Sequence, residues 1–349
     1  LGVPISDIDL STPLLPAEVT ARAEAAGLRA IPTGIDHGTV TLLAGDRAFE
    51  VTTFRADIAT DGRRAVVRFS TEIAEDAARR DFTMNALYAR MDGSLVDPLG
   101  GLADLQARRV RFILDPERRI REDALRILRF FRFTAWYGSE IEAEGLAACA
   151  VLADLIDGLA RERIGAEMRK LLAASDPAPA VAAMAASGVL ARCLPGAETA
   201  ALAPLVAREQ IAGVAPDWRT RLAAITPSMA VETLRLTNAE VRHLSSIAKA
   251  LEAPYGPAAL AASHGAEVAE AALLLRTALE PAPWLPLASE IVRGARAELP
   301  LTARDLVAAG LAEGPMLGAA LSRARTAWLD SDLTLDKAAL MREALDRSL

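Results

Sequence analysis

The feature that most constrains the fold is a change of sequence pattern near Pro116. After it, helical segments separated by glycine and proline continue to the C-terminus, and alanine and leucine dominate. Before it, one helix is expected at residues 16–26, and turn signals separate short strand-like runs. These runs cover residues 3–10, 28–32, 38–44 and 47–54. The pattern predicts a mixed α/β head followed by all-helical regions.

The later part of the head is harder to assign. Residues 57–70 are polar and contain several arginines, so we interpret them as a mobile loop. Residues 73–90 are expected to be helical. Residues 95–113 are expected to hold a short hairpin-like insertion around Asp97-Pro98-Leu99-Gly100-Gly101.

Composition excludes several classes of protein. The formal net charge of −7 excludes a uniformly basic coat, although an RNA partner needs only a local basic stripe. Residues 108–132 supply such a surplus, with nine arginines against four acids (9 − 4 = +5). The two cysteines are expected to be buried thiols, and the three histidines have no zinc-binding spacing. Without a visible signal peptide or a sufficiently long apolar run, we expect no membrane contact and a cytoplasmic location.

A pair of aspartates is the first candidate for chemistry. Asp7 and Asp9 are two residues apart, so on a strand both side chains point to one face. Two carboxylates this close repel each other unless they share a cation, and hard oxygen ligands suit Mg²⁺ or Mn²⁺. Glu50 would complete such a site if its strand neighbours the first. The alternatives are a solvated strand end for the pair and an exposed strand position for Glu50.

Two further stretches combine arginines with acids. Residues 79–86 read Arg-Arg-Asp-Phe-Thr-Met-Asn-Ala, which supplies donors for phosphates and acceptors for ribose hydroxyls. The alternative is a helix with a charged face. Further on, Asp123, Arg126 and Arg129 share one face of an expected helix. They are either a solvated ion-pair ladder or, if they face a cleft, groups that read a base.

Taken in order, these motifs resemble the class II tRNA nucleotidyltransferase and bacterial poly(A) polymerase family, within the polymerase-β nucleotidyltransferase superfamily. A weaker similarity continues through residues 161–167, so the resemblance covers roughly residues 1–175. The motifs are Ser6-Asp7-Ile8-Asp9, residues 33–40, residues 50–55, residues 79–86, residues 97–101 and residues 122–129.

The resemblance implies an α+β fold and a role for each motif. A polymerase-β-like nucleotidyltransferase head is expected at 1–115, a helical neck with base recognition at 116–175, and a helical, tRNA-binding body and tail at 176–349. Asp7 and Asp9 would bind the catalytic metals, a two-Mg²⁺ site, and Glu50 would support them. The expected nucleotide-binding residues are Arg80, Asp81 and Asn85 for phosphates and ribose, Asp123 and Arg126 for the base, and Arg129 beside them.

The implied function is template-independent addition of CMP and AMP to the 3′ end of tRNA, from CTP and ATP. The alternatives are a poly(A) polymerase on the same scaffold and a catalytically inactive RNA-binding relative. The family also carries a glycine-rich turn followed by Arg-Asp that helps hold the triphosphate. This chain begins at Leu1-Gly2, after that point, so we expect a head without its N-terminal part and a folded but poorly active protein from this start.

Overall fold

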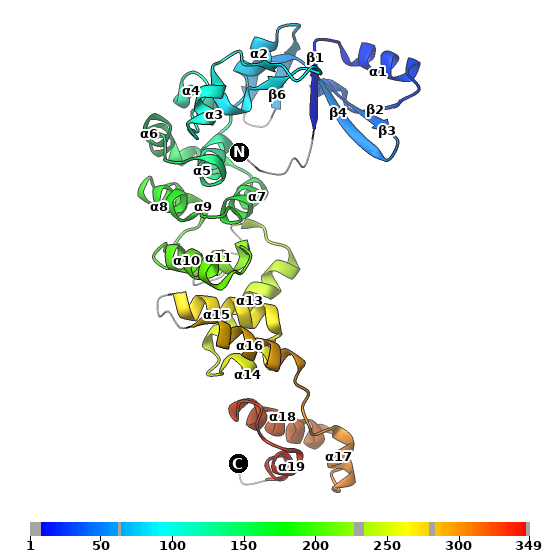
Figure 1. Cartoon of the computed structure of the whole chain (residues 1–349), viewed down its shortest axis with the longest axis vertical. Helices are drawn as coiled ribbons and strands as arrows, with labels where there is room; N and C mark the ends of the chain where they lie inside the picture. The colour runs from blue at the N-terminus through cyan, green and yellow to red at the C-terminus, as the bar shows by residue number, and fades with distance from the viewer. Residues whose placement is uncertain (1–7, 62–63, 227–233, 279–282, 347–349) are drawn as a thin grey trace. The chain divides into compact units, whose positions relative to one another are not determined.

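The computed structural model describes residues 8–61, 64–226, 234–278 and 283–346, with the backbone alone for 57–61 and 64–66 (Figure 1). Its internal contacts divide the chain into two compact units, Leu1–Pro195 and Gly196–Leu349. In the described residues, all strands belong to the first unit, and the second is built from helices. The predicted α+β class is confirmed.

A four-stranded sheet opens the first unit, in the order β1-β4-β3-β2. β1 and β4 run parallel, and the other neighbouring pairs are antiparallel. Helix α1 (Pro16–Ala25) packs on the sheet through Val19, which meets Val40 and Val51 in a small buried cluster. The strands are β1 (Asp9–Thr12), β2 (Arg29–Gly34), β3 (Thr39–Ala44) and β4 (Arg47–Thr53). The expected helix and the three runs after it are therefore found, while β1 extends two residues beyond its predicted end.

The expected loop at residues 57–70 is wrong. β5 (Arg55–Asp61) and β6 (Arg64–Phe69) pair as antiparallel strands over most of that stretch. The sequence signal was an Asp-Gly pair between two runs that contain isoleucine and valine, a pattern typical of hairpins. The arginines obscured that signal.

The expected helix at residues 73–90 is also only partly correct. α2 (Ile73–Ala78) ends early, because the next residues pair with a distant segment: Thr83 donates to the Arg111 carbonyl and Ile113 to the Asp81 carbonyl, both at 3.0 Å. A 3₁₀ turn, η2 (Thr83–Asn85), follows. Phe82 is fully buried against Phe112, with ring centroids 5.0 Å apart, so this packing holds residues 81–83 against residues 111–113.

The Asp97–Gly101 motif closes a small hairpin and starts a helix. The hairpin is β7 (Tyr88–Ala89) with β8 (Leu95–Val96), and the helix is α3 (Gly101–Gln106). Asp97 accepts hydrogen bonds from the backbone N–H of Gly101 (2.8 Å) and Leu102 (3.0 Å), as a helix-capping side chain does. A Cβ on Gly101 would lie 2.0 Å from the Thr83 carbonyl oxygen, so only glycine allows α3 to pack this closely on η2.

Helices complete the first unit. α4 begins at a proline and is capped by Asp115, whose carboxylate accepts from the Arg118 N–H at 2.7 Å. α5 buries an aromatic stripe that includes Phe130, Phe131 and Phe133. The helices are α4 (Pro116–Glu122), α5 (Leu125–Tyr137), α6 (Ala143–Val151), η3 (Ala153–Gly158), α7 (Arg161–Leu172), α8 (Ala178–Ala186) and α9 (Val189–Cys193).

The second unit has two aliphatic cores, one around Leu260 and Leu274 and one around Leu306 and Trp328. Among the described residues, no helix is long and apolar enough to cross a membrane. The helices are α10 (Leu202–Ala212), α11 (Trp218–Ile225), α13 (Asn238–Glu252), α14 (Pro257–His264), α15 (Ala266–Ala278), α16 (Trp284–Arg296), α17 (Ala303–Ala308), α18 (Pro315–Asp330) and α19 (Lys337–Leu345).

Candidate active site

A polar cavity of about 680 Å³ lies in the first unit. Six arginines and five acids line it, so its formal charge is 6 − 5 = +1 in a chain of net charge −7. Nine site residues are predicted from the sequence, and one of them, Asp7, lies outside the residues that the structure describes. The other eight all line this cavity: Asp9, Glu50, Arg80, Asp81, Asn85, Asp123, Arg126 and Arg129.

The acidic side of the cavity is formed by Asp9 and Glu50, which we call the carboxylate edge. Asp9 of β1 and Glu50 of β4 are register partners on neighbouring parallel strands. Register partners point to the same face of a sheet, so the two carboxylates lie side by side. Both residues are exposed, so neither carboxylate is confined by the core. The structure thereby brings together two acids that are 41 positions apart in the sequence (50 − 9 = 41).

Another part of the lining is basic, and we call its residues Arg79, Arg80, Arg126 and Arg129 the arginine wall. Within it, Asp81 is buried and accepts hydrogen bonds from its neighbours: the Phe82 N–H and Asn85 Nδ2 at 2.9 Å and Arg129 Nε at 2.5 Å. Burial alone raises the pKa of Asp81, but the Arg129 charge and these hydrogen bonds outweigh it, and the pKa lies below its ordinary value. Asp81 is therefore an ionised anchor for Asn85 and Arg129.

Arg80 is held in a similar way by Asp76, a buried acid on α2. Asp76 Oδ2 accepts from Arg80 Nη2 at 3.2 Å, and Asp76 Oδ1 accepts from Arg79 Nε at 2.8 Å. Burial opposes ionisation of Asp76, but the two arginines and the Tyr88 hydroxyl lower its pKa overall. One buried carboxylate thus fixes two members of the arginine wall.

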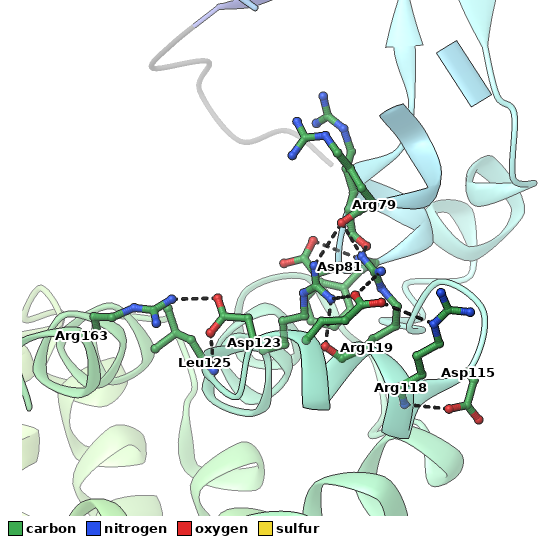
Figure 2. A network of polar contacts seen from close by, with 12 residues as sticks. Arg79, Asp81, Asp115, Arg118, Arg119, Asp123, Leu125 and Arg163 are labelled. Atoms are coloured by element: carbon green, nitrogen blue, oxygen red, sulfur yellow. Dashed lines mark hydrogen bonds and ion pairs between the residues drawn. The ribbon is translucent and has the colours of Figure 1, made fainter. Parts of the chain in front are cut away.

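The sequence predicts that Asp123 lies on a helix. In the structure it does not. Its backbone is extended (φ −153°, ψ 107°) and separates α4 from α5, which turns its side chain into the cavity. Asp123 Oδ1 accepts from the Leu125 N–H at 3.1 Å, and Oδ2 accepts from Arg163 Nη2 of α7 at 2.7 Å (Figure 2). The expected base-reading acid is thus held at a helix junction by two partners.

Arg126 lies one turn after this junction and is mostly buried. Its guanidinium donates to Glu122 (2.7 Å) and to the backbone carbonyls of Arg119 (2.8 Å) and Arg79 (3.0 Å). The buried Arg119 also donates to the carbonyls of Arg79 and Arg80, as the dense group of contacts in Figure 2 shows. Residues 79–81 and the α4–α5 junction are consequently joined as one hydrogen-bonded network.

Sequence reasoning missed four residues of this network: Asp76, Tyr88, Arg119 and Arg163. Arg119 lies inside the arginine-rich stretch 108–132 and Arg163 inside the weakly similar stretch 161–167, and the spacing gives no reason to prefer either over its neighbours. Asp76 and Tyr88 have no local signal, since only the fold brings both to Arg80. A charged residue predicted at a buried position, such as Asp76, would have been the one available clue.

A second group of potential metal ligands, Asp217, His243 and Glu267, lies in the second unit. Arg219 ion-pairs with Asp217 at 3.0 Å and with Glu267 at 2.5 Å. The Arg219 guanidinium therefore already forms an ion pair with each of the two carboxylates, and we assign no metal to this group.

Comparison with known families defines the class of protein. "Poly A polymerase head domain" matches residues 1–111, and "Probable RNA and SrmB- binding site of polymerase A" matches residues 138–200. The first match contains the carboxylate edge and residues 79–86. Fold, site and matches together define an RNA 3′-end nucleotidyltransferase of the poly(A) polymerase-like type.

Individual relatives specify the family. The CCA-adding enzyme of Levilactobacillus brevis is 31% identical over 370 residues, which cover 99% of this chain and 90% of that protein. The crystal structure of the Bacillus stearothermophilus CCA-adding enzyme in complex with CTP matches with a TM-score of 0.75 and 28% identity, covering 99% of this chain and 89% of that one. The chain belongs to the family of CCA-adding enzymes, the tRNA nucleotidyltransferases.

The similarity to longer eukaryotic relatives is confined to part of the chain. The mitochondrial CCA tRNA nucleotidyltransferase 1 of Mus musculus is 42% identical over 178 residues, 49% of this chain and 40% of that protein. The chain therefore spans less than half the length of this relative.

Proposed function

We propose that this chain adds CMP and AMP to the 3′ end of tRNA, using CTP and ATP, to build or repair the CCA terminus. One observation carries the proposal: a single cavity joins the carboxylate edge, the arginine wall and the Asp123 junction. In the reaction, the 3′ oxygen of the RNA bonds to the α-phosphorus of the nucleotide and pyrophosphate leaves. This transfer needs three sets of residues: ligands for the metal, hydrogen-bond donors to the phosphate oxygens, and groups that recognise the base.

We propose that the carboxylate edge, with Asp7, holds Mg²⁺. The donors fit this ion, because they are carboxylate oxygens, and Asp9 and Glu50 are exposed neighbours that face the cavity. When bound, Mg²⁺ would favour the alkoxide form of the RNA 3′-hydroxyl and neutralise the leaving pyrophosphate. The protein's part is to keep the Asp9 and Glu50 carboxylates on one face of a sheet whose backbone is fixed by the β1–β4 pairing.

Arg80 of the arginine wall, with Asp81 and Asn85, is proposed to bind the triphosphate and ribose. Arg80 faces the cavity with its guanidinium fixed by Asp76, and a planar guanidinium matches phosphate oxygens. Asp81 fixes Asn85, which lines the same cavity. Because these groups are bonded before a nucleotide arrives, little side-chain freedom is lost on binding.

Asp123 and Arg126 are proposed to read the base. The Asp123 carboxylate accepts from the exocyclic amine that cytosine and adenine both have, while guanine and uracil present a carbonyl at the corresponding position. Arg126 donates to a ring nitrogen or carbonyl. Three of its five N–H groups donate to protein atoms, and the other two (5 − 3 = 2) have no hydrogen bond to the described residues.

The RNA is proposed to contact the arginine-rich neck and the helices beyond it. The RNA-binding family match at residues 138–200 supports this assignment, and the CTP complex of the Bacillus stearothermophilus relative supports the nucleotide. Domain boundaries after residues 115 and 175 stay a prediction, and so does a cytoplasmic location.

The test uses this chain with Mg²⁺, CTP and ATP on a tRNA trimmed to its discriminator base, followed by sequencing of the product 3′ ends. A CCA terminus after which addition stops is the expected result. A long run of A on any RNA end would replace the proposal with poly(A) addition. No addition by this chain, when a version extended to include the family's glycine-rich turn is also inactive, would indicate an inactive relative.

A further inference from the structure

The hydroxyl of Tyr88 joins two charged groups of the site. It donates to Asp76 Oδ2 at 2.7 Å and accepts from Arg80 Nε at 3.2 Å. The Arg80 guanidinium also lies over the Tyr88 ring, 5.0 Å from its centroid. Tyr88 itself is not among the side chains that line the cavity. Any effect on a bound nucleotide must therefore pass through Arg80 or Asp76, the two cavity residues that the hydroxyl contacts.

Arg80 is constrained on one side and open on the other. Nε donates to Tyr88, Nη1 to the Asn85 carbonyl at 3.2 Å, and Nη2 to Asp76 at 3.2 Å. These bonds use three of the five N–H groups of the guanidinium, and the remaining two (5 − 3 = 2) have no hydrogen bond to the described residues. The side chain is 32% exposed, whereas its partner Asp76 is 2% exposed. The two remaining donors are thus the ones available to a ligand in the cavity.

The position of Tyr88 is itself fixed by packing. Its ring meets Phe54 edge-on at 6.3 Å and packs against the buried cluster of Ala77, Ala86 and Ile113. Burial and the hydrogen bond to Asp76 raise the pKa of Tyr88 to about 12, so the hydroxyl keeps its proton at every pH used in an assay. A rigid ring thereby presents one neutral hydroxyl to Asp76 and Arg80.

We propose that Tyr88 is a positioning residue for the incoming nucleotide: its hydroxyl fixes the Arg80 guanidinium so that two N–H groups face the triphosphate of CTP or ATP. The inference rests on the proposed function, because Arg80 as a phosphate contact is part of that proposal. Without the hydroxyl, Arg80 keeps its charge and its place over the ring but regains rotamer freedom, which must be lost again when the nucleotide binds. This role is independent of the base, so CTP and ATP are affected equally.

The decisive variant is Tyr88→Phe, which removes the hydroxyl and retains the ring, the core packing and the cation–π contact. We expect KM for CTP and for ATP to rise by the same factor, about fivefold, with kcat and KM for tRNA unchanged. Inhibition by tripolyphosphate, which has neither ribose nor base, weakens by the same factor. Tyr137→Phe, the same change at a tyrosine outside the cavity lining, is the matched control and retains wild-type constants.

Two further measurements separate positioning from a general structural effect. In an Arg80→Lys background the Tyr88→Phe change has no additional effect on KM, because its target is gone. Asp76→Asn, which also loosens Arg80, raises both nucleotide KM values as Tyr88→Phe does. The inference would be overturned if Tyr88→Phe left both KM values unchanged, or changed KM for one nucleotide only. Unaltered inhibition by tripolyphosphate would overturn it as well, and so would a double variant in which the two increases in KM multiply.

Failure of this inference is distinguishable from failure of the proposed function. Equilibrium dialysis of ATP with Mg²⁺ against the wild-type chain and Tyr88→Phe measures binding without transfer. If the wild type adds no CMP or AMP to tRNA, the proposed function fails whatever Tyr88 does. If it adds them normally and Tyr88→Phe binds ATP as tightly as the wild type, the role of Tyr88 alone is wrong.

Discussion

The carboxylate edge and the arginine wall face the same cavity but are built in opposite ways. Asp9 and Glu50 are exposed side chains whose positions come from the backbone pairing of β1 with β4. In the wall, Asp76 and Asp81 are buried, and each carboxylate accepts three hydrogen bonds or more from named partners. The edge thus leaves its acids available for a cation, whereas the wall uses its acids internally to hold arginines in place.

This contrast separates acids that serve catalysis alone from acids that also stabilise the fold. An exposed carboxylate contributes little to folding, so its removal is expected to affect chemistry alone. A buried carboxylate that anchors an arginine contributes to both, because its removal leaves a cation without its partner. Substitutions on the two sides should therefore separate activity from stability.

The largest effect is expected for Asp9→Ala at the carboxylate edge. Loss of a metal ligand removes several kcal/mol of transition-state stabilisation, so kcat for CMP addition should fall about a thousandfold or more. Thermal unfolding should stay within about 0.5 kcal/mol of the wild type, because the side chain is exposed. Single-turnover addition to a trimmed tRNA measures the first quantity and calorimetry the second.

Asp46→Ala is the matched control for this variant, since Asp46 is an exposed acid in the turn before β4 and does not line the cavity. It should retain full activity. Near-normal transfer by Asp9→Ala would refute the metal assignment, and a large loss of stability would refute the contrast between the two sides.

Asp81→Asn should affect both properties, which is the signature expected of the wall. Arg129 loses its charged partner, and the free energy of unfolding should fall by about 2 kcal/mol, less than for a fully buried pair because Arg129 is partly exposed. KM for both nucleotides should rise about tenfold, because Asn85 and Arg129 lose their anchor. Urea unfolding and steady-state kinetics measure the two changes.

Glu167→Gln provides the comparison, because it breaks a similarly short ion pair, with Arg132 at 2.6 Å, away from the cavity lining. It should lose similar stability and keep the wild-type KM. If Asp81→Asn lowers stability but leaves KM unchanged, the wall is a structural element and its role in nucleotide binding is wrong.

How far the sequence predicted these regions depends on whether a contact is local. Asp9, Glu50, Arg80 and Asp81 were identified because their motifs are short and contiguous. The role of Asp81 as an anchor was not predictable, because Arg129 is 48 positions away and only the packing of Phe82 under α5 brings the two together. The same limit applies to Arg163 and Asp123, which are 40 positions apart.

The errors in secondary structure have a related cause. The pattern of residues 57–70 was dominated by charge, and the antiparallel pairing of β5 with β6 decided the structure instead. The helix expected at 73–90 ended early because residues 81–83 pair with residues 111–113, a tertiary contact that overrides helix propensity. Long periodic segments after Pro116 were predicted well, because their helices are encoded locally.

The junction between α4 and α5, where Asp123 lies, combines features of the carboxylate edge and of the arginine wall. Its two candidates for base recognition, Asp123 and Arg126, should differ in how much their removal lowers stability. Asp123→Ala should relax discrimination against GTP and UTP about tenfold with little loss of stability, because Asp123 is partly exposed. Arg126→Ala should relax discrimination similarly and also lower the free energy of unfolding by about 2 kcal/mol, because backbone carbonyls of Arg79 and Arg119 lose a donor.

Incorporation of each of the four nucleotides, compared as kcat/KM, measures the discrimination. Arg118→Ala is the control, since Arg118 is a largely exposed arginine of α4 outside the cavity lining. Wild-type selectivity in both Asp123→Ala and Arg126→Ala would exclude this pair as the base reader.

The smallest effect is expected in the pH dependence of stability, which should reflect the buried acids of the arginine wall. Asp76 and Asp81 have pKa values below their ordinary range in the folded state, held there by arginines and hydrogen bonds against the effect of burial. Groups with depressed folded pKa values stabilise the fold above their unfolded pKa, and this stability is lost as the pH falls through the folded pKa. The free energy of unfolding, measured in urea, should therefore fall as the pH drops below about 4. Asp81→Asn should remove part of this dependence. An acid dependence that is identical in Asp81→Asn and the wild type would mean that Asp81 is not a source of it, and the contrast between the two sides would then be one of position alone.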